Sequence, residues 1–243
     1  MNLAKGVCTL TNIPLDTTTE KKLVTFAHRL FSIGAFKVDI KNGFRVKSHD
    51  IRPDTPLSPY YLNLRIGENK KGKLTSTEVN EIGNFFYNYL QKNPIEYQGI
   101  AGVPRAGEPF AKALQEIVYY AQSHALSLVT LKKEEDETGR KIGKVLKTQD
   151  LPRGSNVLLL DDLITKADSK REAVDQLRRD GFLVTDILVF LDREQGAEVE
   201  LKKLGITLHS VVNISFLLKI YEEEHLITPE DVAHIHTYMG KNL

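Results

Sequence analysis

From residue 99 to residue 212 the chain alternates short apolar runs with segments of helical periodicity. Apolar runs of strand length occur at residues 99–103, 127–131, 157–160, 182–191 and 207–212. Between them, apolar residues recur three and four positions apart, which predicts helices at residues 109–123, 169–180 and 197–204. Strands that alternate with helices in this way predict a parallel α/β sheet covered by helices on both faces.

The chain before residue 99 mixes helical and strand patterns. Apolar residues on one stripe predict helices at residues 20–34 and 75–90. Asn42-Gly43 favours a tight hairpin between strands at residues 36–40 and 44–46. A further strand is expected at residues 60–66.

Two other segments complete the organisation of the chain. Residues 132–150 are highly charged and poor in large apolar side chains, which predicts a loop, whereas the tail after residue 213 is expected to be helical. We therefore expect three parts: an N-terminal α+β hood or appendage at residues 1–74, a core at residues 75–213 and a helical tail at residues 214–243.

The composition is that of an ordinary globular protein. The chain has 243 residues, of which 41% are hydrophobic and 27% charged, so it can bury a sizeable core. Lys and Arg total 33 against 32 Asp and Glu, and this balance disfavours a nucleic-acid or anionic-membrane partner. A single cysteine, the lack of a signal-peptide pattern and the lack of a long apolar span lead us to expect a cytoplasmic protein.

The strongest candidate for chemistry is a pair of acids directly after the most apolar run. Asp161 and Asp162 follow residues 157–160 and precede a short turn and a helix. In an open parallel sheet ligands bind at this end of the strands. The carboxylates suit ribose hydroxyls or a Mg²⁺ held through water, and the turn suits a phosphate. The alternative is a strand that ends in two solvated acids, with Ser169 capping the next helix.

Several segments, in the same order along the chain, resemble the type I phosphoribosyltransferases, and among them the orotate phosphoribosyltransferases. The acid-acid-apolar-apolar-Thr pattern at residues 161–165 is similar to the family's ribose-phosphate signature. The other matching segments are residues 44–48, 58–65, 102–109, 191–196 and 209–211, and the tail is similar to that of the orotate domain of UMP synthases. The resemblance implies the type I fold, with a five-stranded parallel sheet flanked by helices and a small hood.

The resemblance also implies a reaction. Orotate would take the 5-phosphoribosyl group from phosphoribosyl pyrophosphate (PRPP) and give orotidine 5′-monophosphate and pyrophosphate, in de novo pyrimidine synthesis. It further implies Mg²⁺ as cofactor and a homodimer whose active sites share a mobile loop. Catalysis of such a transfer depends on orientation and charge stabilisation.

Carried over by position, the resemblance gives roles to residues on the ribose and orotate sides. Asp161 and Asp162 would hold the ribose hydroxyls and, through them or through water, the metal. Thr165 and Arg193 would face orotate, since a guanidinium can bind a planar carboxylate through two hydrogen bonds. A surface ion pair of Arg193 with Asp192 or Glu194 is the alternative. Tyr60 and Tyr61 would stack on the pyrimidine, or else pack in the core.

Other residues correspond to the family's phosphate contacts. Lys132 and Lys133 match the mobile loop and are the candidate catalytic lysines. Lys47 would contact orotate or the diphosphate, although alone it would be an ordinary surface lysine. The remaining candidates for substrate phosphates are Arg105, in the pyrophosphate loop, and Lys166 and Ser169, in and after the turn.

The chain departs from the family at three of these phosphate sites. Ala167 and Asp168 stand where two glycines are usual, and Asp168 brings a carboxylate to a phosphate position. In the mobile loop Asp136 replaces a lysine and Thr138 a histidine, although Arg140, Lys141 or Lys144 could serve a shifted loop. In the pyrophosphate loop Ala106 replaces a lysine, beside Arg105.

These departures leave two functions open. One is an active orotate phosphoribosyltransferase with rearranged phosphate contacts. The other is a diverged, catalytically weak or inactive protein of the same fold, with a ligand-binding or regulatory role. Another base in place of orotate is disfavoured by the matches at residues 58–65 and 192–196.

Overall fold

The structure is a computed structural model of the chain. It describes residues 17–46, 49, 54–67, 72–136, 139–147 and 151–240, and of residues 17, 133–136, 139–141 and 146–147 it describes the backbone alone. Two residues considered above, Lys47 and Thr138, lie outside the described residues. In the described part of the chain, no helix is both long and apolar enough to cross a membrane.

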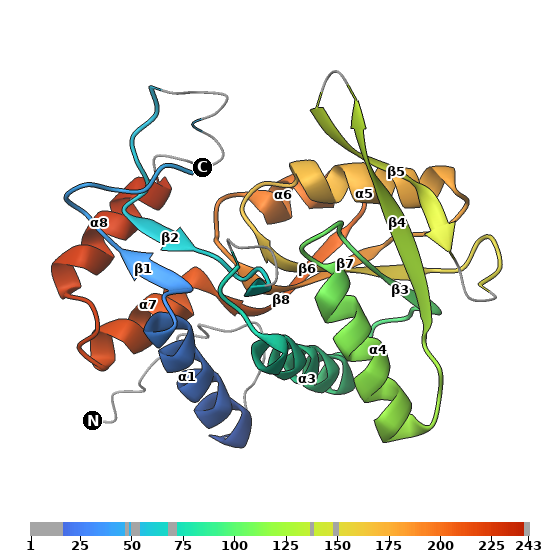
Figure 1. The fold of residues 1–243 in the computed structure, drawn as a ribbon, viewed down its shortest axis with the longest axis horizontal. Coiled ribbons are helices and arrows are strands. Elements are labelled where there is room, and N and C mark those ends of the chain that lie inside the picture. The colour runs from blue at the N-terminus through green and yellow to red at the C-terminus, as the bar shows by residue number, and fades with distance from the viewer. Residues whose placement is uncertain are drawn as a thin grey trace, which may run out of the picture.

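A six-stranded mixed sheet forms the centre of the molecule (Figure 1), in the order β5-β4-β3-β6-β7-β8. All neighbours are parallel except β5, which runs antiparallel to β4 at one edge. The strands are β3 (Gly99–Gly102), β4 (Ser127–Asp136), β5 (Gly139–Lys147), β6 (Val157–Ile164), β7 (Asp186–Asp192) and β8 (Thr207–Asn213). The predicted five parallel strands are confirmed, and β6 lies inside the sheet, between β3 and β7.

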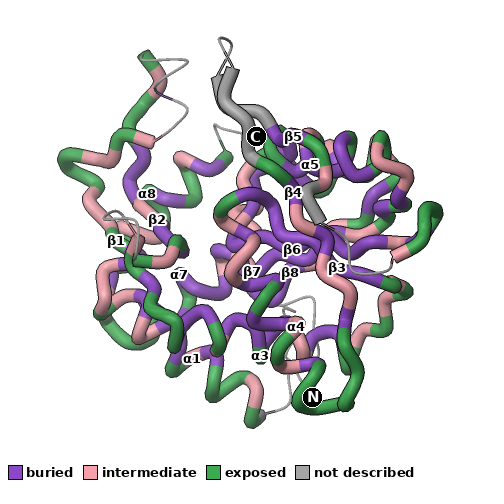
Figure 2. The backbone as a smooth tube through the Cα atoms, turned by 45° about the vertical axis from the view of Figure 1, so that its right-hand side comes forward, coloured by how far each residue is buried: buried purple, intermediate pink, exposed green. Residues whose placement is uncertain are grey.

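Apolar side chains of the inner strands are buried on both faces of the sheet (Figure 2). Along β6, Leu158 and Leu160 join a core that includes Phe86 and Phe190, whereas Val157 and Leu159 join a second core. Successive side chains of a strand point to opposite faces, so this alternation explains why the run is apolar throughout.

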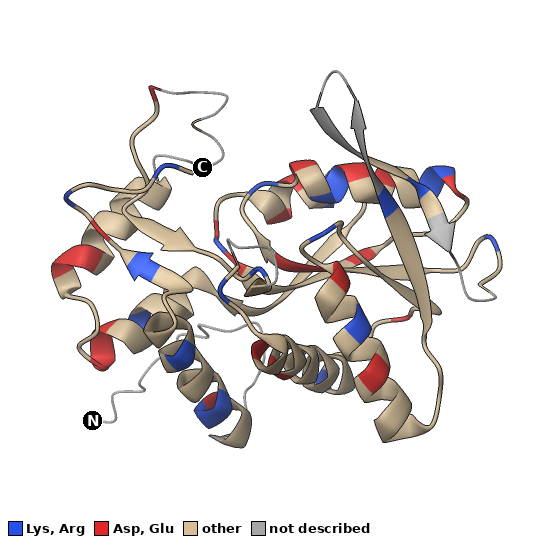
Figure 3. Ribbon diagram, viewed as in Figure 1, with Lys and Arg blue, Asp and Glu red and all other residues tan. Residues whose placement is uncertain are grey.

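Four helices connect the strands and cover the sheet. They are α3 (Ser76–Lys92), α4 (Glu108–Gln122), α5 (Asp168–Arg179) and α6 (Ala197–Lys202). Buried residues of α3 and α4 belong to the first core, and those of α5 and α6 to the second, so the two pairs cover opposite faces. Charged residues lie along the helices, while the inner strands carry few (Figure 3).

The charged segment at residues 132–150 differs from its prediction as a loop. Most of it extends β4 to Asp136 and forms β5. The outer edge of β5 is held by α5: Glu172 accepts a hydrogen bond from the Ile142 N–H (2.5 Å), and Asp180 accepts one from the Val145 N–H (2.9 Å). These bonds satisfy edge N–H groups that are otherwise left unpaired. Composition alone misled because carboxylates on a distant helix complete this strand.

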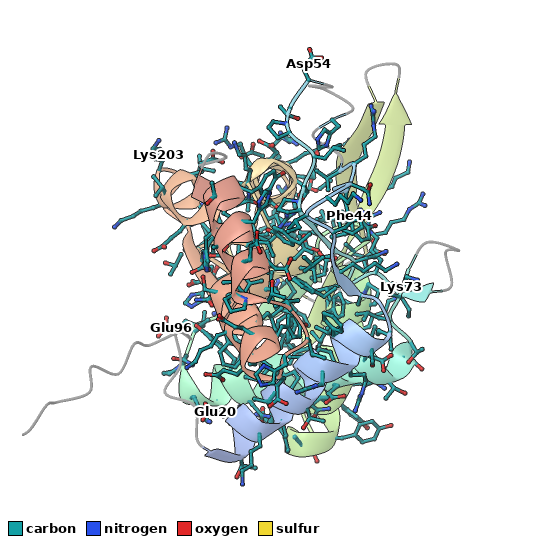
Figure 4. The ribbon with its side chains drawn as sticks, turned by 90° about the vertical axis from the view of Figure 1, so that its left-hand side faces the viewer. Glu20, Phe44, Asp54, Lys73, Glu96 and Lys203 are labelled. Atoms are coloured by element: carbon teal, nitrogen blue, oxygen red, sulfur yellow. The ribbon has the colours of Figure 1, made fainter. Side chains whose placement is uncertain are left out.

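The N-terminal and C-terminal segments pack together beside the sheet (Figure 1). They comprise α1 (Thr17–Ser32), β1 (Phe36–Val38), β2 (Tyr60–Leu62), α7 (Ile214–Glu223) and α8 (Pro229–Gly240). The Tyr221 hydroxyl donates to the carbonyl of Ala27 at 3.0 Å, which joins α7 to α1. Figure 4 shows this side of the molecule, with Asp54 at the far tip of the segment between β1 and β2.

The hairpin expected around Asn42-Gly43 was wrong in its partner. β1 pairs antiparallel with β2, and Phe44 forms only an isolated bridge with Ser58. Gly43 has φ +66°, and a Cβ there would lie 2.6 Å from the Cβ of Leu57. The pair therefore makes a turn, but the strand that returns to β1 comes from residues 60–62 instead of 44–46.

Candidate functional site

Asp161 and Asp162 lie near the carboxyl end of β6 and are both buried, with exposed fractions of 2% and 6%. The strand continues past them to Ile164, because Asp161 and Leu163 still pair with β7. The carboxylate of Asp161 accepts from the Asp162 N–H (3.0 Å), and that of Asp162 accepts from the Leu163 N–H (2.7 Å). The two acids are therefore held in place inside the sheet and do not stand in open solvent.

A buried lysine neutralises the first of these acids. The Lys170 ammonium on α5 lies 2.6 Å from Asp161 Oδ2, and it also donates to the carbonyl of Leu163 at 2.7 Å. Both side chains of the pair are almost fully buried, at 7% and 3% exposure. A charge in such a place needs a partner of opposite charge, and each of these groups supplies it for the other.

The second acid keeps its proton in a substantial share of molecules at neutral pH. Burial and the negative charge of Asp161 raise the pKa of Asp162 to about 7, although Lys170 opposes the shift. Two adjacent carboxylates with one buried ammonium retain a single net negative charge only if both are ionised. A shared proton on Asp162 removes that charge, so this carboxyl group can either donate or accept a hydrogen bond near neutral pH.

The turn after β6 leads directly into α5. The helix begins at Asp168, and Ala167 occupies the capping position, where its side chain offers no hydrogen bond. The Ala167 N–H instead donates to Oε2 of Glu200, from α6, at 3.2 Å. Lys166, Asp168 and Ser169 are exposed around the turn. Ser169 is thus inside the first helical turn and does not cap the helix.

Arg193 follows β7 and is brought to the same edge of the sheet as Thr165. Its Nε donates to the Tyr60 hydroxyl at 2.9 Å, and one terminal nitrogen donates to Thr165 Oγ1 at 3.3 Å. The guanidinium carbon lies 4.7 Å from the centre of the Tyr60 ring, a cation–π contact. The structure thus joins three sequence-predicted residues from three separate segments.

The acids that flank Arg193 have other partners. Asp192 accepts a hydrogen bond from the Glu194 N–H at 2.9 Å, and Glu194 accepts from the N–H (3.0 Å) and hydroxyl of Ser215. Burial raises the pKa of Asp192 to about 6. These bonds fix the loop after β7 and leave the Arg193 guanidinium to Tyr60 and Thr165.

The two tyrosines have different surroundings. Tyr60 is fully buried and its ring stacks on Phe36, with centroids 6.0 Å apart, so it packs in the core and holds Arg193 through its hydroxyl. Tyr61 is partly exposed and its ring lies 5.8 Å from that of Phe44. Of the two rings, only that of Tyr61 is accessible enough to meet a planar ligand.

Arg105 and Lys132 are exposed basic residues on neighbouring segments. Arg105 lies in the loop between β3 and α4, which is packed closely against β6: a Cβ on Gly107 would lie 2.2 Å from the Leu160 carbonyl. Lys132 lies on β4, as does Lys133, whose side chain is not described. Lys47 lies outside the described residues.

The described residues contain no group of three or more His, Cys, Asp or Glu that could hold a metal ion. Asp161 is already paired with an ammonium, so direct coordination of a cation by it would have to displace Lys170. The donor set fits a Mg²⁺ bound mainly by ligand phosphates and water, which is how proteins commonly hold this ion.

Two residues of this site, Lys170 and Glu200, were missed at the level of sequence. Lys170 had a signal: it falls on the buried face of α5 with Ala173, Val174 and Leu177, where a lysine is unusual and needs an acidic partner. Glu200 had none, because the contact joins α6 to a turn 33 residues earlier. Only the packing of α6 beside α5 brings the two together.

Comparison with known proteins identifies the family of the chain. Residues 74–218 match the phosphoribosyl transferase domain. The chain is 30% identical to orotate phosphoribosyltransferase of Sulfurisphaera tokodaii over 187 residues, which cover 77% of this chain and 87% of that protein. It is 27% identical to bovine uridine 5′-monophosphate synthase over 186 residues, which cover 76% of this chain but only 36% of the bovine protein.

A solved structure shows the same fold at lower identity. The orotate phosphoribosyltransferase of Francisella tularensis superposes with a TM-score of 0.64 at 15% identity, covering 96% of this chain and 98% of that one. The domain match spans more than half of the 243 residues and includes β6, the turn after it and Arg193. The chain is therefore a member of the phosphoribosyltransferase family.

Proposed function

We propose that the chain is an orotate phosphoribosyltransferase, which transfers the 5-phosphoribosyl group of PRPP to orotate. A ring nitrogen of orotate forms a bond to C1 of the ribose as the bond from C1 to the diphosphate breaks. The nitrogen loses its proton, and the products are orotidine 5′-monophosphate and pyrophosphate. Membership of the family and relatives named for this activity support the proposal.

The observation that carries the proposal is the fixed guanidinium of Arg193. Tyr60, on β2, and Thr165, directly after β6, take two of its N–H groups. The remaining donors can bind a planar carboxylate such as that of orotate, and a pre-oriented guanidinium loses little freedom in doing so. Arg193 follows β7, the strand beside β6 and its acids, so a base bound there would lie next to a ribose held by β6.

On the ribose side we assign the hydroxyl contacts to Asp161 and Asp162. Lys170 holds Asp161 in place, and the raised pKa of Asp162 gives this group a proton to share at neutral pH. The diphosphate is assigned to Arg105 and Lys132, with Lys47 and Lys133 as further candidates. Mg²⁺ would neutralise the leaving pyrophosphate and would be held by its oxygens and water in front of the two acids.

A second candidate function is a weak or inactive family member that binds ligands. Two contacts favour it, because they already satisfy the groups that a substrate would use: Lys170 with Asp161, and Glu200 with the Ala167 N–H. The acidic Asp136, in the segment assigned to the mobile loop, also favours this second function. On this reading PRPP or a nucleotide binds without being turned over.

The assembly and the division of the chain are also part of the proposal. We infer a cytoplasmic homodimer in which the β4–β5 hairpin of one subunit reaches the site of its partner. We assign covering of the base to the hood at residues 1–74. The core at residues 75–213 carries out the transfer, and the tail at residues 214–243 supports the hood. Sedimentation equilibrium that shows a monomer at micromolar concentration would exclude the shared site.

The direct test is loss of orotate absorbance in the presence of PRPP and Mg²⁺. We expect turnover by the wild type and at least a tenfold lower kcat/KM for Arg193→Lys, because a charge-assisted hydrogen bond contributes about 1.5–3 kcal/mol. Arg153→Lys, at an exposed position before β6, is the matched control and should leave kcat/KM unchanged. Binding of PRPP by calorimetry without any loss of orotate would support the second function instead.

A further inference from the structure

The turn between β6 and α5 is the part of the site where the chain itself supplies an anion. The Ala167 N–H donates to a carboxylate oxygen of Glu200 at 3.2 Å. Backbone N–H groups at the start of a helix carry partial positive charge and lack partners within the helix. A ligand phosphate at this turn would need the same donor, so it would meet a group that is already engaged.

The charges around the turn compensate for this carboxylate at most in part. Asp168 is the first residue of α5 and adds a second negative charge, in an exposed position. Lys170 points to Asp161 and the Leu163 carbonyl, so its ammonium is committed to the buried side. Lys166 is exposed at the turn and is the nearest basic residue along the chain.

We propose that Glu200 is a specificity-determining residue, whose carboxylate occupies the phosphate position of the turn and must leave it before a ribose 5-phosphate can bind. The inference rests on the proposed function, because the ribose-phosphate signature that the chain shares with the family implies that the 5-phosphate of PRPP binds at this turn. Its consequence is a site that discriminates against phosphate at this point. The phosphate of a substrate binds at the turn only when it displaces the Glu200 carboxylate.

Glu200 is suited to such a role by its position. It is partly exposed, on the short helix α6, and a glutamate side chain can rotate away without any movement of the backbone. Ala167, in contrast, is fully buried and fixed, so the N–H stays in place when the carboxylate leaves. Removal of the Glu200 side chain should therefore free a pre-formed donor, removal of its charge should make the carboxylate's replacement easier to displace, and both should leave the fold intact.

The test is the affinity of the full chain for inorganic phosphate and for ribose 5-phosphate, measured by calorimetry. Glu200→Gln keeps the length of the side chain and removes its charge, and Glu200→Ala removes the acceptor as well. Both variants should bind either ligand roughly tenfold more tightly than the wild type. Glu198→Gln, an exposed acid on the same helix, is the control and should bind as the wild type does. Far-ultraviolet circular dichroism checks that each variant is folded.

A second readout locates the effect. Phosphate should shift the amide resonance of Ala167 more strongly in Glu200→Gln than in the wild type. Equal affinities in all four proteins, or tighter binding with no change at Ala167, would overturn the inference. Its failure is distinguishable from that of the proposed function, because the latter is read from orotate consumption: tighter phosphate binding without turnover upholds the role of Glu200 and rejects the enzyme.

Discussion

Replacement of Lys170 by Met removes one partner of the buried ion pair while keeping a side chain of similar length. In the wild type the Lys170 ammonium and the Asp161 carboxylate lie 2.6 Å apart with exposed fractions of 7% and 3%. In the variant Asp161 keeps its hydrogen bond from the Asp162 N–H but loses its counter-charge, and Asp162 still lies beside it. We expect Lys170→Met to destabilise the fold strongly at pH 7.

The magnitude follows from the distance and the burial. At 2.6 Å and an effective dielectric constant of about 20, the gross attraction is roughly 6 kcal/mol. Desolvation of both groups offsets much of it, so the pair itself adds little net stability. Loss of one partner is different, because the other charge stays buried, and such losses cost about 3–5 kcal/mol. For a chain of this size that corresponds to a melting temperature lower by roughly 6–20 °C.

The assay is thermal and urea unfolding at pH 7, with Lys203→Met, at an exposed position labelled in Figure 4, as the control. The control should lie within about 0.5 kcal/mol of the wild type. The double variant Asp161→Asn with Lys170→Met should recover most of the loss, since it leaves no unpaired charge. A melting temperature of Lys170→Met within 2 °C of the wild type would refute the reasoning, and so would a double variant no more stable than the single one.

Three further predictions concern other charged groups. The pKa of Asp162 is raised to about 7 in the folded state, so between about pH 4 and pH 7 the native state binds a proton that the unfolded state has lost, and the free energy of unfolding falls as pH rises. Asp162→Asn should flatten this dependence, which is measured as a smaller decrease of melting temperature between pH 5 and pH 8. Asp168→Asn should tighten PRPP binding roughly fivefold in calorimetry, the equivalent of about 1 kcal/mol of repulsion in water at ~4 Å, and an unchanged affinity would mean that the carboxylate points away from the phosphate. Asp180→Ala should speed amide hydrogen exchange at Val145 at least tenfold, because its 2.9 Å acceptor is lost, whereas equal acceleration at Ile142 would indicate general loosening of β5.

The core of the fold was predictable because burial on both sides leaves a strong trace in the sequence. Strands such as β6 are apolar at every position of their first half, and α5 ends at Arg179, one residue before the predicted end of that helix. Where an element is buried on one side only, its apolar pattern predicts the structure less well. The β5 strand was missed because its outer edge is completed by Glu172 and Asp180 of another element. The partner of β1 was predicted wrongly because a turn at Gly43 does not determine which later strand pairs with β1.

The candidate site likewise has features that the sequence predicts and features that only tertiary packing determines. The pairing of Thr165 with Arg193 follows from the order of the strands, because residues that end neighbouring parallel strands meet at one edge. The burial of Tyr60 and the contact of Glu200 do not, since they depend on how β2 and α6 pack against that edge. The apolar strand with its two acids and the family resemblance therefore located the candidate site, whereas tertiary packing decided which of its groups remain available.

The internal ion pair and the internal anion bear differently on the question of activity. Lys170 supports Asp161 from the buried side, so it can hold the carboxylate in place during binding and need not leave. Glu200 binds the turn at a donor that a ligand phosphate would use, so it competes directly with substrate. An enzyme can retain the first contact and still turn over, at the cost of weaker metal affinity at the acids. If the ribose 5-phosphate binds at this turn, as proposed, the second contact lowers the affinity for PRPP itself, and Glu200 then bears more directly on substrate binding than the acids of β6 do.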